Sequence, residues 1–176
     1  MKYTDVAVIG GGQCGLAMSY CLAARGIDHV VLERGRIGER WQSERWDSLR
    51  LITPNWMTRL PGRSYSGPDP DGFMAVSGMA SLLAEYARSF TAPVNNGVAV
   101  TRIVRDGSRY LITTDRDVWA SRTVVLSTGG FDEPHIPKIA HALSPRIEQV
   151  VPSTYRNPDR LRPGGVLVVG ASATGV

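Results

Sequence analysis

The sequence has few cysteines, and their placement excludes several kinds of site. Cys14 and Cys21 are the only two cysteines among 176 residues. They lie seven positions apart in one predicted helix, which places them on the same side but about two turns from each other, too far for a disulfide. The spacing also differs from that of a CxxC redox pair or a zinc knuckle. We therefore expect two buried, reduced thiols and no metal site.

Long hydrophobic segments and targeting signals are also missing. The first residues, MKYTDVAVIGGG, contain one basic residue and a short apolar run that ends at glycines. A signal peptide has a longer apolar region and a more basic start. No later stretch approaches the roughly eighteen apolar residues that a membrane span needs. The sequence therefore predicts a soluble cytoplasmic protein with no membrane partner.

The charge is mildly basic and has no cluster. The formal net charge is +4, and the 20 lysines and arginines are scattered singly, without a basic run. A protein that follows a phosphate backbone usually concentrates its basic residues on one face, so this pattern argues against a nucleic-acid partner. An excess of arginine suits an anionic cofactor equally well. With 43% hydrophobic residues, the composition is that of an ordinary globular chain.

The first part of the chain predicts a β-α-β unit of about thirty residues. Residues 5–9 form a β-branched apolar run, which is typical of a parallel strand buried on both faces. Apolar residues recur at helical spacing over residues 13–25, and Gly26 is placed to end that helix. Residues 29–33 then predict a second strand.

The middle of the chain predicts a long connection, a helix and a small sheet. Residues 34–71 show no sustained period but contain three tryptophans, and an ordered loop of that length is usually functional. Residues 77–90 predict an amphipathic helix with Ser77 as a candidate N-cap. An antiparallel meander is predicted for 98–104, 110–114 and 118–121, a return to the parallel sheet for 123–127, and a final buried strand for 166–169.

A glycine motif connects the first predicted strand to the first helix. Gly10, Gly12 and Gly15 form GxGxxG, in the segment GGGQCG, and Gln13 begins the helix. Gly10 allows a tight turn, Gly12 lets the backbone approach a pyrophosphate, and Gly15 lets the helix pack close to the strand. The helix N-terminus then directs free N–H groups and the positive end of its dipole at the phosphates. This context predicts a dinucleotide site.

Glu33 ends the second predicted strand, about twenty residues after the glycine motif. A carboxylate at this position accepts hydrogen bonds from both ribose hydroxyls of an adenosine. It also repels a 2′-phosphate, which favours FAD or NAD over NADP. The alternative is an ordinary solvated glutamate at a strand end.

Three further features resemble the flavin-containing monooxygenases, along nearly all of the chain. The segment VVLSTGGFDEPHIP is similar to the ATG-type motif of these flavoproteins, with matches at Ser127, Thr128, Gly129 and Gly130. In that family the motif closes the FAD site beside the first glycine motif. The predicted meander is similar to the family's β insertion, whose first strand lies near the adenine, and Val100 is the matching position.

The third feature is a second glycine motif near the end of the sequence. GASATG, with Gly170, Ser172 and Gly175, resembles the family's NADPH-binding motif with serine in place of the middle glycine. The segment from Arg34 to Trp56, with RIGERW and WDSLRLITPNW, is similar to the loop that runs under the flavin. This similarity implies that Arg34 and Trp41, together with residues near Thr53, are cofactor neighbours.

Two departures from the family pattern leave the subclass open. Pro152 stands where the identifying stretch of flavin-containing monooxygenases has a histidine. Ile52 occupies the position of an asparagine that several of these enzymes place near the flavin. No side chain stands out as a catalytic residue, and His29, His135 and His141 are interpreted as structural or solvated.

The resemblance implies an α/β fold: a Rossmann-type FAD-binding domain with a parallel sheet and a small antiparallel β-meander insertion. Residues 1–163 would be this FAD-binding domain, incomplete here, and residues 164–176 the start of a truncated NAD(P)-binding domain. Because the predicted last strand has no covering helix, we expect self-association or dependence on a missing C-terminal partner segment.

The resemblance also implies an activity for the complete enzyme. NADPH would reduce FAD, and a C4a-hydroperoxyflavin would then transfer oxygen to a small-molecule substrate. Two alternatives remain open: a flavin-dependent NAD(P)H reductase without oxygenation, and a non-catalytic truncated nucleotide-binding module.

Overall fold

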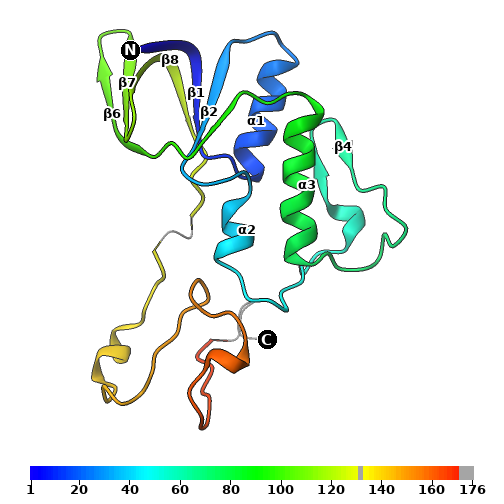
Figure 1. Ribbon diagram of the computed structural model, residues 1–176, viewed down its shortest axis with the longest axis vertical. Coiled ribbons are helices and arrows are strands. Elements are labelled where there is room, and N and C mark those ends of the chain that lie inside the picture. The colour runs from blue at the N-terminus through cyan, green and yellow to red at the C-terminus, as the bar shows by residue number, and fades with distance from the viewer. Residues whose placement is uncertain (131–132, 171–176) are drawn as a thin grey trace.

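A six-stranded sheet with helices packed on one side forms the main body of the molecule, in a computed structural model that describes residues 1–130 and 133–170 (Figure 1). The strand order is β5-β2-β1-β8-β7-β6. The strands are β1 Lys2–Ile9, β2 His29–Glu33, β3 Arg59–Leu60, β4 Arg63–Ser64, β5 Val94–Asn96, β6 Val100–Asp106, β7 Arg109–Thr114 and β8 Val118–Leu126. The helices are α1 Gln13–Ala23, α2 Glu39–Ser43 and α3 Val76–Ser89, with 3₁₀ turns at Asn55–Met57, Lys138–Ala142 and Pro158–Arg160.

The sheet has a parallel half and an antiparallel half, and β8 belongs to both. Strands β5, β2, β1 and β8 are parallel, whereas β7 runs antiparallel to β8 and β6. The predicted meander strand 118–121 and the predicted returning strand 123–127 are therefore one continuous strand, and their separation was wrong. No glycine or proline interrupts residues 118–126, so nothing in the chain ends the strand between them.

The two faces of the sheet are covered by different elements. Val6 and Val8 of β1 pack with Val31 of β2 and Leu22 of α1 on one face. Ala7 and Ile9, which point the other way, pack in a cluster with Ile112 of β7 and Trp119 of β8. The alternation of a pleated strand thus buries β1 on both sides. Side chains of β7 and β8 therefore cover the face opposite α1.

Helices α1 and α3 lie side by side on the helical face (Figure 1). Tyr20 of α1 stacks on Tyr86 of α3 with ring centroids 5.8 Å apart, and Phe90 meets both rings edge-on. The prediction of Ser77 as N-cap was wrong, because α3 begins at Val76 after an extended Ala75. Val76 donates its N–H to the carbonyl oxygen of Leu49, so a backbone partner serves where a side-chain cap was expected.

The segment 133–170 differs from the body in structure (Figure 1). Within its described residues it contains only two short 3₁₀ turns. One contact with the body joins Asp47 N–H to the carbonyl oxygen of Arg156 at 2.8 Å, and Asn157 Nδ2 also donates to the Asp47 carboxylate. The predicted strand at residues 166–169 is not formed, and these four side chains are 62–87% exposed. A strand needs a neighbour for its backbone hydrogen bonds, and none of the described strands pairs with this segment.

Three smaller observations complete the fold. Both cysteines are free, but Cys14 is exposed and Cys21 half-buried, so the expectation of two buried thiols was wrong. His29 is structural, since its Nε2 lies 2.8 Å from Ser19 Oγ and its Nδ1 lies 2.9 Å from the Ile27 carbonyl oxygen. Among the residues described, no helix combines the length and apolar character needed to cross a membrane.

Candidate functional site

The ends of three parallel strands meet at one edge of the sheet, where the chain leaves β1, β2 and β8. Gly10, directly after β1, donates its N–H to the Leu32 carbonyl oxygen of β2 at 2.9 Å. Ser127, directly after β8, donates to the Ile9 carbonyl oxygen of β1 at 2.8 Å. The sheet grows from β1 in both directions, so this edge is a topological switch point, where open α/β sheets bind their ligands.

The three motif glycines occupy three different surroundings at this edge. Gly10 has a φ of +106°, and a Cβ on it would lie 2.6 Å from the Ser127 carbonyl oxygen. A Cβ on Gly15 would overlap the Gly10 carbonyl oxygen. By contrast, a Cβ on Gly12 would meet nothing within 4 Å. The first and third glycines are therefore required by packing, and the middle one leaves open space above the N-terminus of α1.

Glu33 is held by the backbone beside this loop. Its Oε2 accepts a hydrogen bond from Gly11 N–H at 2.5 Å, and its Oε1 accepts one from Gly35 N–H at 2.8 Å. The residue is only 9% exposed. The alternative of a solvated glutamate is thus wrong. Each carboxylate oxygen has lone pairs left, so the group could also accept hydroxyl donors.

Gln13, Trp41 and Thr53 line one cleft of about 220 Å³ that adjoins the glycine loop. The indole of Trp41 packs against α3, and the Arg45 guanidinium lies 5.4 Å from its ring centre. The resemblance had implied Trp41 and residues near Thr53 as neighbours of one ligand. The remaining residues lining the cleft are Leu51, Met57, Thr58 and Met79.

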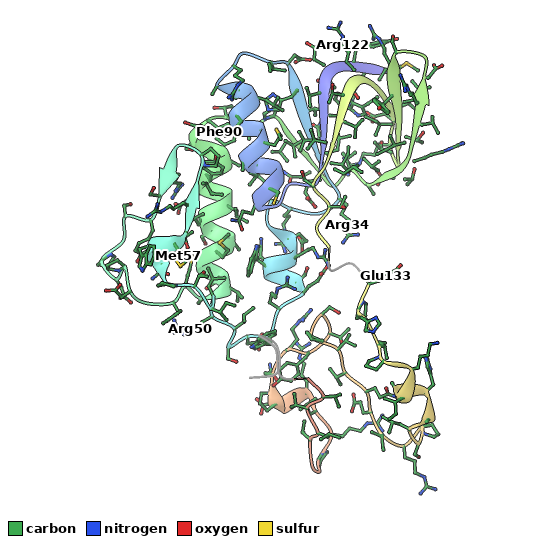
Figure 2. All side chains as sticks on the ribbon, turned by 180° about the vertical axis from the view of Figure 1, so that it is seen from behind. Arg34, Arg50, Met57, Phe90, Arg122 and Glu133 are labelled. Atoms are coloured by element: carbon green, nitrogen blue, oxygen red, sulfur yellow. The ribbon has the colours of Figure 1, made fainter. Side chains whose placement is uncertain are left out.

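Arginines of the segment after β2 gather around one carboxylate. Arg40 Nε donates to Glu44 Oε2 at 2.6 Å, and Arg34 Nη2 lies 3.9 Å from Glu44 Oε1. Burial lowers the pKa of Arg45, and the positive charge of Arg40 lowers it further. Figure 2 shows Arg34 at the end of the sheet where the chain leaves β8 toward Glu133. Two arginine side chains thus converge on the Glu44 carboxylate.

The other predicted site residues are more spread out. Val100 begins β6 and packs half-buried on the core, while Val98, two residues earlier, donates to the Glu33 carbonyl oxygen at 2.9 Å. Thr128 and Gly129 are exposed after β8. Gly170 is the last described residue of the segment 133–170, and Ser172 and Gly175 fall outside the described residues.

Sequence reasoning missed several residues at this edge. Gly11 and Gly35 bind the Glu33 carboxylate through their N–H groups, and α2, which contains Arg40, was taken as part of an irregular connection. A glycine two residues after the acid was a readable signal, because it allows the chain to turn back toward the carboxylate. Arg40 had no signal of its own, since its position depends on the direction in which α2 leaves Gly38.

A second cavity lies elsewhere and contains none of the predicted site residues. It has about 340 Å³ and lies between α3 and the β3–β4 hairpin, where Arg63 and Glu85 form an ion pair at 2.7 Å. The dinucleotide motifs and this cavity are thus separate features.

Comparison with known proteins finds oxidoreductases, among them a flavin-containing monooxygenase. The chain is 39% identical over 172 residues to an uncharacterized CzcO-like oxidoreductase of Geobacillus kaustophilus, covering 97% of this chain and 49% of the relative. The flavin-containing monooxygenase of Stenotrophomonas maltophilia has 32% identity and a TM-score of 0.71, over 78% of this chain and 42% of that one. A structure described as OTEMO in complex with FAD and NADP shares the fold, with 20% identity and a TM-score of 0.63, over 77% and 27%.

The resemblance stated from the motifs is confirmed by these matches. The chain spans about half the length of the curated relatives it matches. The model of the pyridine nucleotide-disulphide oxidoreductase family matches residues 7–176, which is nearly the whole chain. On this evidence the chain belongs to the pyridine nucleotide-disulphide oxidoreductase family, among relatives that include CzcO-like oxidoreductases and flavin monooxygenases.

Proposed function

We propose that this chain forms the FAD-binding portion of a flavin-dependent, NADPH-using monooxygenase. One observation supports the proposal most strongly: the open loop at Gly12, the fixed carboxylate of Glu33 and the cleft at Gln13 and Trp41 adjoin one another at one edge of the sheet. A dinucleotide has a diphosphate, a ribose and a planar ring system. The open loop suits the diphosphate, the carboxylate suits the ribose, and the cleft suits the planar ring system.

The residues would divide the binding of FAD among them. The N-terminus of α1, open at Gly12, would receive the diphosphate on its free N–H groups. Glu33 would accept the adenosine ribose hydroxyls while it keeps its bonds to the loop. Trp41 and Thr53 would face the flavin, and Val100 the adenine. Thr128 and Gly129 would close the site from the β8 side.

The carboxylate of Glu33 fits FAD better than NADP at this first site. A buried carboxylate repels a 2′-phosphate, whereas it binds an unmodified ribose well. FAD would supply the hydride acceptance and oxygen activation that no side chain of this protein provides. The protein's own part is to bind, orient and shield, and we assign no catalytic residue.

NADPH would bind at the second motif, with Gly170, Ser172 and Gly175, at the start of a domain that begins near residue 164. Because the chain spans about half of its relatives, the complete activity needs elements beyond this sequence. A soft nucleophile such as a sulfide or amine, or a ketone, is the class of substrate proposed. Rapid flavin reduction by NADPH without any oxygenated product would instead favour the reductase alternative.

The decisive measurement is the visible spectrum of the purified chain after it is mixed with FAD and freed of unbound cofactor. The proposal expects flavin bands at close to one FAD per chain. Gly12→Val is the control, because its side chain would occupy the open space above α1 and remove the bands. A colourless wild-type protein would contradict an FAD site in this chain and leave the non-catalytic module as the better account.

A further inference from the structure

We propose that the cavity between α3 and the β3–β4 hairpin is a separate small-molecule site, which binds a small zwitterion with a short apolar side chain, such as a free amino acid. The cavity has about 340 Å³. This lies at the lower end of the range of about 300–1,000 Å³ that is typical of ligand pockets. Its described lining contains no residue of the first glycine motif, so the inference goes beyond the proposed FAD site.

The hairpin and one face of α3 form the two walls of the cavity (Figure 1). Four residues of α3 at helical spacing line it together: Gly78, Ser81, Leu82 and Glu85. The hydroxyl of Tyr86 donates to the Pro61 carbonyl oxygen in the turn of the hairpin at 2.7 Å. This bond ties the helix to the hairpin, so the cavity lies between two elements whose relative position is fixed.

Among the described residues that line the cavity, Arg63 and Glu85 alone carry a charge. Arg63 Nη2 donates to Glu85 Oε2 at 2.7 Å, and the two side chains are 32% and 52% exposed. An ion pair this exposed contributes little to stability, so its groups can exchange each other for a ligand. A carboxylate would bind Arg63 and an ammonium group would bind Glu85, whereas a ligand with a single charge would be repelled by one of them. The charges of the wall therefore favour a zwitterion.

Asn55 adds an acceptor without a partner to the same lining. The residue is 6% exposed, its backbone N–H donates to the Gly72 carbonyl oxygen at 2.9 Å, and its Nδ2 donates to the Asp69 carbonyl oxygen at 2.8 Å. Both donors thus point to the loop 69–72, and Oδ1, on the other edge of the planar amide, points away from it. Within the described part of the chain, Oδ1 is buried and accepts no hydrogen bond. A buried acceptor left unpaired is unfavourable, and an ammonium N–H would satisfy it.

Met74 and Leu82 supply the apolar part of the wall. Both side chains are half-buried and pack against the core cluster between the helices. A Cβ on Gly78 would lie 2.9 Å from Met74 Cγ, so Met74 lies directly over a helix position that has no side chain. A methionine changes its conformation easily, which allows the wall to admit a short aliphatic chain and a donor to reach Asn55.

The test titrates the ¹⁵N-labelled full chain with L-norvaline, which has both charges, with butylamine, which has only the ammonium group, and with pentanoate, which has only the carboxylate. L-Norvaline should shift the amide resonances of residues 63–67 and 78–85 in a saturable way. Each analogue with one charge should bind at least about 10-fold more weakly, as for the loss of a hydrogen bond to a charged group. The side-chain NH₂ resonance of Asn55 should also shift, because a hydrogen bond to Oδ1 polarises the same amide group.

Variants of the wall test the same assignment. Arg63→Gln and Glu85→Gln should each lower the affinity for L-norvaline about 10-fold or more. Arg36→Gln is the control, since it removes one partner of an ion pair outside the cavity. Ser81→Phe should block the cavity from an exposed helix position, and Ser77→Phe, on the same helix but outside the lining, is its matched control.

Three results would overturn the inference: no saturable shift with L-norvaline, equal affinity for either analogue with one charge, or unchanged affinity in a folded Arg63→Gln protein. An Asn55 NH₂ resonance that stays in place at saturation would do the same. Circular dichroism establishes that each variant is folded before its affinity is compared with that of the wild-type protein.

Discussion

Two segments of this protein have nearly the same sequence pattern and different structures. Residues 5–10, DVAVIG, lead into the first glycine motif, and residues 166–170, VLVVG, lead into the second. In the first, residues 6–9 are at most 8% exposed within β1, with a parallel strand on each side. In the second, residues 166–169 are 62–87% exposed and form no strand. The same apolar run thus becomes a strand only where neighbours supply its hydrogen bonds and cover its side chains.

The contrast extends to the regions that surround the two segments. The body up to residue 130 forms three clusters of buried residues, on both faces of the sheet and between the helices. The described part of 133–170 contributes no residue to them and contacts the body near Asp47. We therefore expect substitutions in the body to change the free energy of unfolding, and substitutions near residues 166–169 to change association.

The largest expected loss of unfolding free energy comes from a substitution at Gly15, where helix α1 lies directly against the backbone of Gly10. In Gly15→Ala, the new Cβ would overlap the Gly10 carbonyl oxygen, so α1 must move away from β1. Overpacking of this kind costs about 2–3 kcal/mol of unfolding free energy. Urea denaturation measures the loss. Gly12→Ala is the control, because its Cβ meets nothing within 4 Å and the expected loss is below about 1 kcal/mol. Equal losses in the two variants would contradict the packing argument.

Glu33 should give the next largest effect, even without cofactor. In Glu33→Gln the amide NH₂ would face one of the two backbone N–H groups that now donate to the carboxylate. An unsatisfied buried donor costs about 1–3 kcal/mol, so both unfolding free energy and FAD affinity should fall. Glu39→Gln provides the comparison, since Glu39 pairs with an exposed Arg36 and surface pairs contribute at most about 1 kcal/mol. If Glu33→Gln weakened FAD binding without any loss of stability, the loop would not depend on the carboxylate.

Tyr86 should have a smaller effect with a distinct pH dependence. Its hydroxyl donates to the Pro61 carbonyl oxygen at 2.7 Å, and burial raises its pKa to about 12. Because the folded pKa exceeds the ordinary value of 10.0, the stabilisation is fully present below pH 10 and is lost as the pH rises toward 12. Tyr86→Phe should lose about 1 kcal/mol at neutral pH.

The measurement for Tyr86 is the difference in unfolding free energy between wild-type protein and Tyr86→Phe across this pH range. Tyr3→Phe, at an exposed position, is the control and should show no such difference. A wild-type advantage that persisted above the raised pKa would show that the hydroxyl proton does not matter.

The exposed segment should give the smallest change in unfolding free energy and a clear change in association. The double substitution Leu167→Asp and Val169→Asp should leave the unfolding free energy within about 0.5 kcal/mol of wild type. It should also reduce self-association, because a contiguous apolar patch is replaced by charge. Sedimentation velocity at increasing concentration measures this. A wild-type chain that stays monomeric at high concentration would remove the basis for the prediction.

Local patterns were sufficient to predict the elements around the glycine motif. Strand β2, helix α1 and the turn at Gly26 follow from apolar periodicity and from one glycine with a φ of +66°. The acid at Glu33 was predicted from its distance to the motif. These features depend on residues close together in the sequence, so the sequence contains most of the information that determines them.

Features that depend on distant partners could not be predicted in the same way. The strand at 166–169 fails for lack of a neighbour, and β5 was missed because three residues give too little pattern. The bonds from Gly11 and Gly35 to Glu33 join backbone groups, which carry no side-chain signal. The closeness of Arg40 to Gly129 depends on the path of α2 across the sheet edge.

Strand β8 has a consequence for which changes in length the protein tolerates. It pairs with β7 through residues 118–121 and with β1 as far as Leu126, and Ser127 then bonds to Ile9. A deletion inside β8 would therefore turn buried side chains outward and also shift the loop containing Gly129. The turn at Gly107, between β6 and β7, has no such coupling. We expect natural and engineered insertions to accumulate at Gly107, while the length of β8 remains fixed across homologous sequences.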